Sequence, residues 1–287
     1  MEGAIWGSFA ALFLGGADFA GRFSGRALGA PSAMLGVVAV GSFLLTIAVL
    51  GGGDFPPIAP AGLLLIAGYG VSTAVMGVML YAALARGPVS VVAPIVASHP
   101  VLIAAYWYSR GVRPDAIQWA AITGTILGVM LVALSHEQGG NGEERRARGA
   151  LHVTLFIAAG ACLAHAVLVI AAQAATPYYE PLQIAWMGRI VSFITLLGYF
   201  AVLRQGPNVH GRWWQFLIAQ GLMDAAGHYC LFVGSRSDSV TAAVATSAFG
   251  AVTTLLAWLV LREAMGRIQW LGVVLVFAGI GVLAARG

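Results

Sequence analysis

Three features of the sequence predict an all-α polytopic membrane protein, with ten transmembrane helices arranged as two inverted five-helix repeats. Sixty per cent of the 287 residues are hydrophobic and only 9% are charged, whereas a soluble domain has about 25% charged residues. The apolar residues form long runs, and ten spans of about 20 residues would leave only short connections. The pattern of the first half also returns in the second half.

The repeat appears at a constant offset of 151 positions. Trp258 then corresponds to Trp107, and residues 268–270 correspond to residues 117–119. Each copy is an apolar run, a short turn with arginine and a second apolar run. Because each half has an odd number of helices, the second half must enter the membrane from the opposite face.

Glycine and proline mark the boundaries of the first five helices. A run of glycines and three prolines follow the second helix, and Gly87-Pro88 turns the chain after the third. Pro94 and Pro100 flank Ser98-His99, so the fourth helix cannot keep a complete hydrogen-bond ladder and is expected to line a cavity. Gly124 and Gly128 have the spacing of a helix-packing motif. The expected helices are residues 3–21, 31–50, 61–84, 89–108 and 117–135.

The second half follows the longest hydrophilic segment, residues 137–149. This linker separates a first repeat, residues 1–136, from a second repeat, residues 150–287. The expected helices of the second repeat are residues 150–174, 181–203, 213–234, 240–261 and 268–285. The first apolar run has no positive segment before it and no convincing cleavage site, so we expect a retained helix.

The basic residues exclude several classes of protein. All fifteen are arginine, which excludes a lysine-containing phosphate loop and a lysine Schiff base. No basic stripe is interleaved with aromatic residues, so a nucleic-acid partner is not expected. No metal-ligand cluster, HExxH or GxSxG motif occurs. We therefore expect no enzyme activity, cofactor or metal, and we expect Cys162 and Cys230 to be buried thiols.

Ten arginines fall in the connections after the odd-numbered helices, and four fall on the opposite side. Arginine-rich loops stay in the cytoplasm. This count predicts that both termini lie outside.

Asp224 is the foremost candidate for a functional residue, because a carboxylate within a membrane span is costly. Gln220 lies one turn before it and His228 one turn after it, so the three side chains share a helix face. We expect Asp224 to bind a coupling proton or a substrate ammonium, with His228 tuning it. The alternative is a structural polar seam between helices.

Arg189 cannot lose its proton, so it requires an acidic partner or an anionic substrate. Asp18 and Asp224 are its candidate partners within the membrane. A purely structural pair is the alternative. Asp18 has a further alternative, because Arg22 lies one turn later on the same helix and could hold it.

Four further residues complete the set of candidates. His99 lies between two prolines and His165 within the sixth helix, where buried structural histidines are the alternative. Tyr69 shares a helix face with Thr73 and corresponds to Gln220 in the repeat. We therefore expect Tyr69 and Thr73 to line the site, although other aromatic residues near span ends are typical of interface belts.

The duplicated half, the opening Ile5-Trp6-Gly7-Ser8, the segment from Tyr81 to Pro100 and the hairpin from Leu256 to Gln269 resemble the drug/metabolite transporter superfamily, specifically its EamA-domain branch. The resemblance covers nearly the whole chain. Arg189 lies where this family often has an arginine, and the first repeat has no counterpart. The resemblance implies a ten-helix secondary carrier with a central cavity between the halves. Family members usually keep both termini in the cytoplasm, in contrast to the arginine count.

The residues and the resemblance together favour a secondary active transporter, an exporter of a small polar or zwitterionic metabolite such as an amino acid, driven by protons or by exchange. A multidrug or hydrophobic-cation exporter and a lipid-linked carrier translocase are the alternatives. We expect a multi-pass protein of the plasma membrane, which is the inner membrane in bacteria. The expected partners are the small-molecule substrate and membrane lipid, with the chain acting as a monomer or a homodimer.

Overall fold

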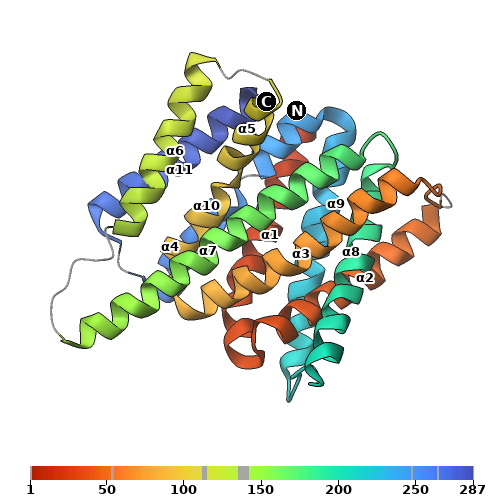
Figure 1. Ribbon diagram of the computed structural model, residues 1–287, viewed down its shortest axis with the longest axis horizontal. Coiled ribbons are helices and arrows are strands. Elements are labelled where there is room, and N and C mark those ends of the chain that lie inside the picture. Colours follow the sequence, from red (N-terminus) through yellow and green to blue (C-terminus); the bar gives the residue numbers. More distant parts are fainter. Residues whose placement is uncertain are drawn as a thin grey trace.

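The computed structural model describes residues 2–52, 55–111, 115–134, 142–246, 248–263 and 265–286, and this part of the chain forms helices without strands (Figure 1). The all-α fold class is therefore confirmed. The first half contains α1 (Glu2–Leu28), α2 (Ala30–Gly52), α3 (Pro60–Arg86), α4 (Val89–Ala97), α5 (His99–Ser109) and α6 (Ala116–Leu134). The second half contains α7 (Gly142–Ala175), α8 (Pro181–Leu203), α9 (Trp213–Thr246), α10 (Phe249–Leu261) and α11 (Arg267–Arg286).

Five helical stretches of the described chain are long and apolar enough to cross a membrane: Ala30–Gly52, Pro60–Arg86, Val89–Tyr106, Leu151–Ala175 and Pro181–Leu203. Shorter apolar helices occur at Ala116–Val132, Phe249–Leu261 and Arg267–Val282. Many large apolar side chains point outward, among them Phe43, Leu64 and Phe156. An outer surface of this kind suits contact with lipid rather than water.

The fourth span is broken, as the two prolines predicted. Helix α4 ends at Ala97 and α5 begins at His99, with Ser98 between them. The Ser98 amide donates to the carbonyl of Ile95 instead of continuing the α-helical ladder. The second half has an interruption at the equivalent place, between Thr246 and Phe249, which the sequence did not predict.

Three helices are longer than the sequence predicted. Helix α1 continues to Leu28 instead of ending near residue 21, and α7 begins at Gly142, within the expected linker. Helix α9 runs through residues 235–239, where a turn between two helices was expected. In the first half Gly87-Pro88 enforces the equivalent turn, but residues 235–239 contain no proline, so no backbone donor is missing there.

The main contacts between first-half helices and second-half helices have counterparts in which the two halves swap roles. Helix α1 packs against α9, and its counterpart α7 packs against α3. Likewise α2 packs against α9 while α8 packs against α3, and α1 contacts α10 while α7 contacts α4 and α5. The pairs α2 with α8, α4 with α10 and α6 with α11 join equivalent helices. Such reciprocal packing is expected of two halves related by a pseudo-twofold axis.

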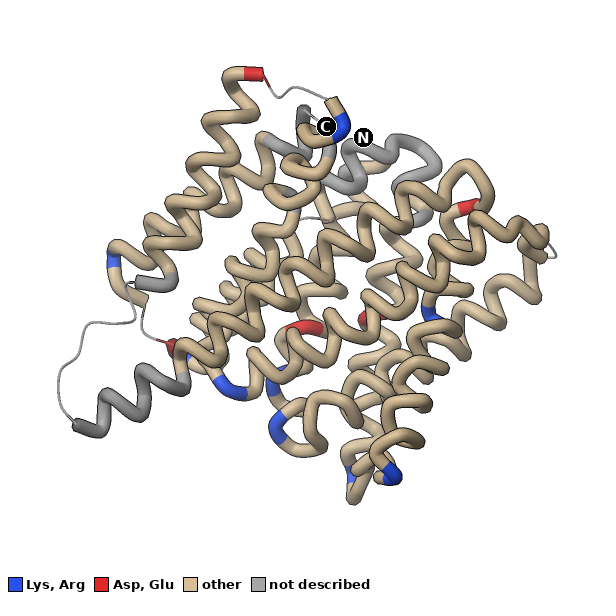
Figure 2. Tube along the Cα trace, viewed as in Figure 1, with Lys and Arg blue, Asp and Glu red and all other residues tan. Residues whose placement is uncertain are grey.

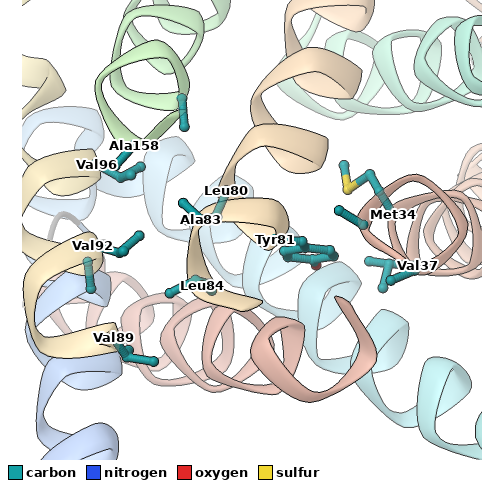
Figure 3. Close-up of a cluster of buried hydrophobic side chains, with 14 of the residues drawn as sticks. Met34, Val37, Leu80, Tyr81, Ala83, Leu84, Val89, Val92, Val96 and Ala158 are labelled. Atoms are coloured by element: carbon teal, nitrogen blue, oxygen red, sulfur yellow. The ribbon is translucent and has the colours of Figure 1, made fainter. Parts of the chain in front are cut away.

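The main hydrophobic core lies mostly among the first-half helices and extends to residues of α7, α8, α9, α10 and α11. Tyr81 of α3 lies beside Met34 and Val37 of α2, and Leu84, Val89 and further apolar side chains continue the cluster (Figure 3). Close packing of this kind, rather than exclusion from water, holds helices together in lipid.

Helices α6 and α11 approach each other closely at two glycines. A Cβ at Gly128 would lie 2.6 Å from the carbonyl oxygen of Gly272, and one at Gly272 would lie 2.7 Å from that of Gly128. Gly128 is therefore a packing residue, as expected. Gly124, its predicted companion, faces open space instead.

Corresponding loops of the two halves lie at opposite ends of the bundle. The loop before α3 contacts the α7–α8 connection, where the Tyr179 hydroxyl donates to the carbonyl of Ala59. The α8–α9 connection instead contacts the start of α2, where the Asn208 amide donates to Ser32 Oγ. Figure 2 shows most basic positions gathered at one end of the bundle, the arginine-rich end. The N-terminal end of α1 and the C-terminal end of α11 lie at the opposite end (Figure 1). Which end faces the cytoplasm stays a prediction.

Candidate functional site

A buried ion pair joins α8 to α9. Arg189 Nη2 lies 2.7 Å from Asp224 Oδ2, and the two side chains are 4% and 14% exposed. A buried pair requires good geometry and further hydrogen bonds to offset the loss of water. Arg189 Nη1 is buried and has no hydrogen-bond partner in the described part of the chain. The sequence predicted this pair as one of two choices.

His228 completes this group one turn after Asp224. Its Nδ1 lies 2.8 Å from the backbone carbonyl of Asp224, and Arg189 Nη2 lies 3.0 Å from Nδ1 and 3.2 Å from Nε2. A carbonyl only accepts and a guanidinium only donates. The contacts are therefore satisfied when a neutral His228 donates from Nδ1 and accepts at Nε2. The His228 ring therefore lies beside both charged groups, with Nδ1 3.8 Å from Asp224 Oδ1 and Nε2 3.2 Å from Arg189 Nη2.

Asp18 brings a second carboxyl group to the site from α1. Asp224 and Arg189 both lie close enough to interact with it electrostatically. Asp18 is partly exposed and forms no ion pair with the described residues. The alternative pairing with Arg22 is wrong, because the Arg22 guanidinium contacts Glu263 and the carbonyl groups that end α3.

Tyr69 and Thr73 lie on the face of α3 that approaches α8. Both are buried, and Thr73 Oγ1 donates to the carbonyl of Tyr69 at 2.8 Å. The Tyr69 ring packs directly on Gly188, where a Cβ would collide with it, and Arg189 and Asp224 lie within electrostatic range. The structure therefore brings Tyr69 to the site, whereas the Thr73 hydroxyl is bonded to the backbone of its own helix.

Gln220 connects three helices beside the ion pair. Its Nε2 donates to the carbonyl of Ala17 on α1 at 3.1 Å and to the Tyr81 hydroxyl on α3 at 2.9 Å. Its Oε1 is buried and has no hydrogen-bond partner among the described residues.

Two further residues lie at the site: Tyr81, which the sequence analysis set aside with the other aromatic residues near span ends, and Gly41, which it did not single out. Tyr81 lies within electrostatic range of Asp18 and Asp224, and its spacing of two and three helical turns from Thr73 and Tyr69 could have indicated it. Gly41 of α2 faces the ion pair, because a Cβ there would lie 3.7 Å from Asp224 Oδ2. No signal in the sequence distinguishes Gly41 from the other glycines.

His99 and His165 meet each other in a separate cluster. Their rings stack with centroids 3.8 Å apart and an angle of 5°, and the Phe249 ring lies beside both, with its centroid 6.3 Å from that of His99 and 5.8 Å from that of His165. His99 Nδ1 lies 3.3 Å from the carbonyl of Val96. His165 Nδ1 is buried and has no hydrogen-bond partner in the described chain. Of the two, His165 lies within electrostatic range of His228. The structure does not bring them to the ion pair itself.

The site thus combines one permanent cation with two carboxyl groups. It lies between α1, α2 and α3 of the first half and α8 and α9 of the second. Arg189 and Asp224 balance each other's charge, so an ionised Asp18 has no balancing charge within the pair. An added proton or a cationic group would supply that balance.

Comparisons with known proteins agree with this architecture. The family model of the EamA-like transporter family matches residues 1–134 and 152–285, one match in each half. No curated protein matches the chain. A solved structure described only as the crystal structure of a protein is 16% identical, with a TM-score of 0.64. Its alignment covers 98% of this chain and 96% of that one, and at this identity the likeness shows the fold alone.

Proposed function

The chain belongs to the EamA-like transporter family of the drug/metabolite transporter superfamily, so it is a multi-pass membrane transporter in a family of carriers rather than enzymes, and we propose that it is a secondary active exporter of a small zwitterionic metabolite such as an amino acid. Its place is the plasma membrane, the inner membrane in bacteria. Movement of substrate is coupled to protons or to exchange.

Two groups of the buried site, an unpartnered donor and a carboxyl group without an ion pair in the described chain, carry this proposal. Arg189 has a buried Nη1 donor without a partner in the described chain, which suits a substrate carboxylate. Asp18 has no ion pair among the described residues, which suits a substrate ammonium or a proton. One site that presents both charges recognises a zwitterion better than a simple cation or anion.

The proposed architecture is ten spans in two inverted repeats, broken between residues 135 and 150. The reciprocal packing of the halves supports it, and so do the opposite positions of corresponding loops. Because Arg189 and Asp224 come from one half and Asp18 from the other, rocking of the halves would open the site to each side in turn.

Cysteine labelling tests the inverted topology. Asp54, which lies outside the described residues, and Asn208 occupy corresponding loops, and cysteines placed there are expected to react from opposite sides. Labelling from the same side would contradict the inversion. A reporter fused after Gly287 and active only in the cytoplasm is expected to stay silent, because the arginine count places both termini outside.

Transport in proteoliposomes tests the substrate class. A panel of labelled amino acids, sugars and cationic dyes is measured with wild-type protein and with Arg189→Gln. Amino-acid transport that requires Arg189 supports the proposal. Transport of hydrophobic cations that survives Arg189→Gln would favour the multidrug alternative, in which a carboxylate rather than Arg189 binds the substrate. Transport of a lipid-linked carrier and of no soluble compound would favour a translocase.

A further inference from the structure

A hollow of about 450 Å³ lies at the arginine-rich end, away from the central site. Three arginines, one carboxylate and the start of α4 line it, and its residues are Arg22, Arg26, Arg86, Gly87, Pro88, Ser90 and Glu263. They come from α1, the α3–α4 turn and the α10–α11 turn, so both halves of the chain contribute. Nothing in the proposed transport cycle uses these residues.

The Glu263 carboxylate is already bonded to groups of the protein itself. It accepts from the Val89 amide at 3.0 Å, from the Ser90 amide at 2.9 Å and from Ser90 Oγ at 2.7 Å, and its Oε1 lies 3.4 Å from Arg22 Nη1. It therefore caps the positive end of α4 and balances one guanidinium.

The arginines retain unused donors and unbalanced charge. Arg22 Nη1 donates to the carbonyl of Gly87 at 2.7 Å, but Arg22 Nε is buried without a partner in the described chain. Arg26 Nε donates to the carbonyl of Ala85, and the exposed Arg86 forms no ion pair with the described residues. Three guanidinium groups against one carboxylate leave two positive charges in the hollow.

We propose that this hollow is a binding site for a phosphate-type oxyanion, supplied by the head group of an acidic phospholipid or by a soluble phosphate compound. Guanidinium groups present donors in a planar fork that matches phosphate oxygens, and two of the three remain available on the open side. Basic pockets between membrane helices on the positively charged side bind anionic lipid head groups in this way. The site does not depend on the identity of the transported substrate.

The test measures binding to the full chain in neutral detergent. Native mass spectrometry and thermal unfolding are recorded with added phosphatidylglycerol, with phosphatidylcholine and with inorganic phosphate. The variant Arg26→Gln/Arg86→Gln removes the two available guanidinium groups, and about 1 kcal/mol per arginine predicts about thirtyfold weaker anion binding. The control Arg204→Gln/Arg212→Gln removes the same charge at exposed positions outside the hollow.

Each outcome decides the proposal. Binding of phosphatidylglycerol but not phosphatidylcholine, weakened only by the hollow variant, supports it with lipid as the source. Binding of inorganic phosphate with the same dependence supports it with a soluble source. Equal loss in the hollow variant and the control would show a general charge effect and overturn the site. Failure of both anions to bind the wild type would overturn it as well.

Discussion

Two arginine–carboxylate pairs in this chain have similar burial and different surroundings. Arg22–Glu263 lies at the arginine-rich end, with side chains 12% and 14% exposed, and Arg189–Asp224 lies inside the bundle at 4% and 14%. Glu263 accepts three hydrogen bonds at the start of α4, and Arg22 donates to carbonyl groups at the end of α3. That pair holds helix ends together.

The central pair has no such helix ends to hold. Arg189 Nη1 is buried without a partner in the described chain, and His228 and Asp18 compete for the same charges. Buried polar donors are usually satisfied, so an unsatisfied one requires an explanation. Arg22 Nε is also buried without a partner in the described chain, so the contrast lies in the backbone contacts: the Arg22–Glu263 pair binds backbone groups at two helix ends, and neither side chain of the Arg189–Asp224 pair does so among the described residues. The predictions below test this distinction, in order of their expected effect on stability.

The largest effect is expected for Arg189→Gln. Removing one partner leaves the Asp224 carboxylate buried without a cation, which costs about 3 to 5 kcal/mol. The double variant Arg189→Gln/Asp224→Asn removes both charges and is expected to recover most of this stability, because two neutral amides can hydrogen-bond. Transport should stay absent in both variants. Thermal unfolding and proteoliposome uptake measure the two effects; recovered transport in the double variant would make the pair structural.

An intermediate effect is expected for Glu263→Gln. The amide keeps one acceptor for the start of α4 but loses the charge that balances Arg22 and the helix dipole, at a cost of about 1 to 2 kcal/mol. Adding Arg22→Gln should not restore stability, because Arg22 also holds the end of α3. Transport per folded molecule should be unchanged. A transport defect without a loss of thermal stability would reverse the assignment of this pair.

The two regions also show what the sequence could predict of the fold. Helix α8 was predicted to the residue and α2 and α3 to within two residues, because proline and glycine mark their ends. The continuation of α9 through residues 235–239 was not predicted, because polar residues suggest a turn without enforcing one. Proline and glycine therefore predict helix boundaries better than polar residues do.

The central site was largely predictable and the arginine-rich end was not. The cost of ionisable groups in lipid identified Arg189, Asp224 and His228 from the sequence. Arg22 was assigned by helical spacing to Asp18, yet it pairs with Glu263 from the other half. Gly41 and the stacking of His99 on His165 also depend on which helices meet. Local spacing carries no information about such contacts.

The smallest effect on stability, and the sharpest separation of the two roles, is expected for Asp18→Asn. Asp18 forms no ion pair with the described residues, so a neutral substitution of nearly equal shape breaks no salt bridge and should not lower the free energy of unfolding. If Asp18 takes up the coupling proton, the amide fixes it in a neutral form. Accumulation driven by a pH gradient should then be lost, while exchange of substrate across the membrane persists.

The matched control for Asp18→Asn is Glu2→Gln, which removes one carboxylate from the exposed start of the same helix and should leave both activities unchanged. Uptake across an imposed pH gradient is measured for both variants and normalised to folded protein. Wild-type pH-driven uptake in Asp18→Asn would exclude Asp18 as the coupling group. Asp224 would then be the remaining carboxylate of the central site, and it would have to release Arg189 in order to take up the proton. The same uptake assay on Asp224→Asn would test that step directly.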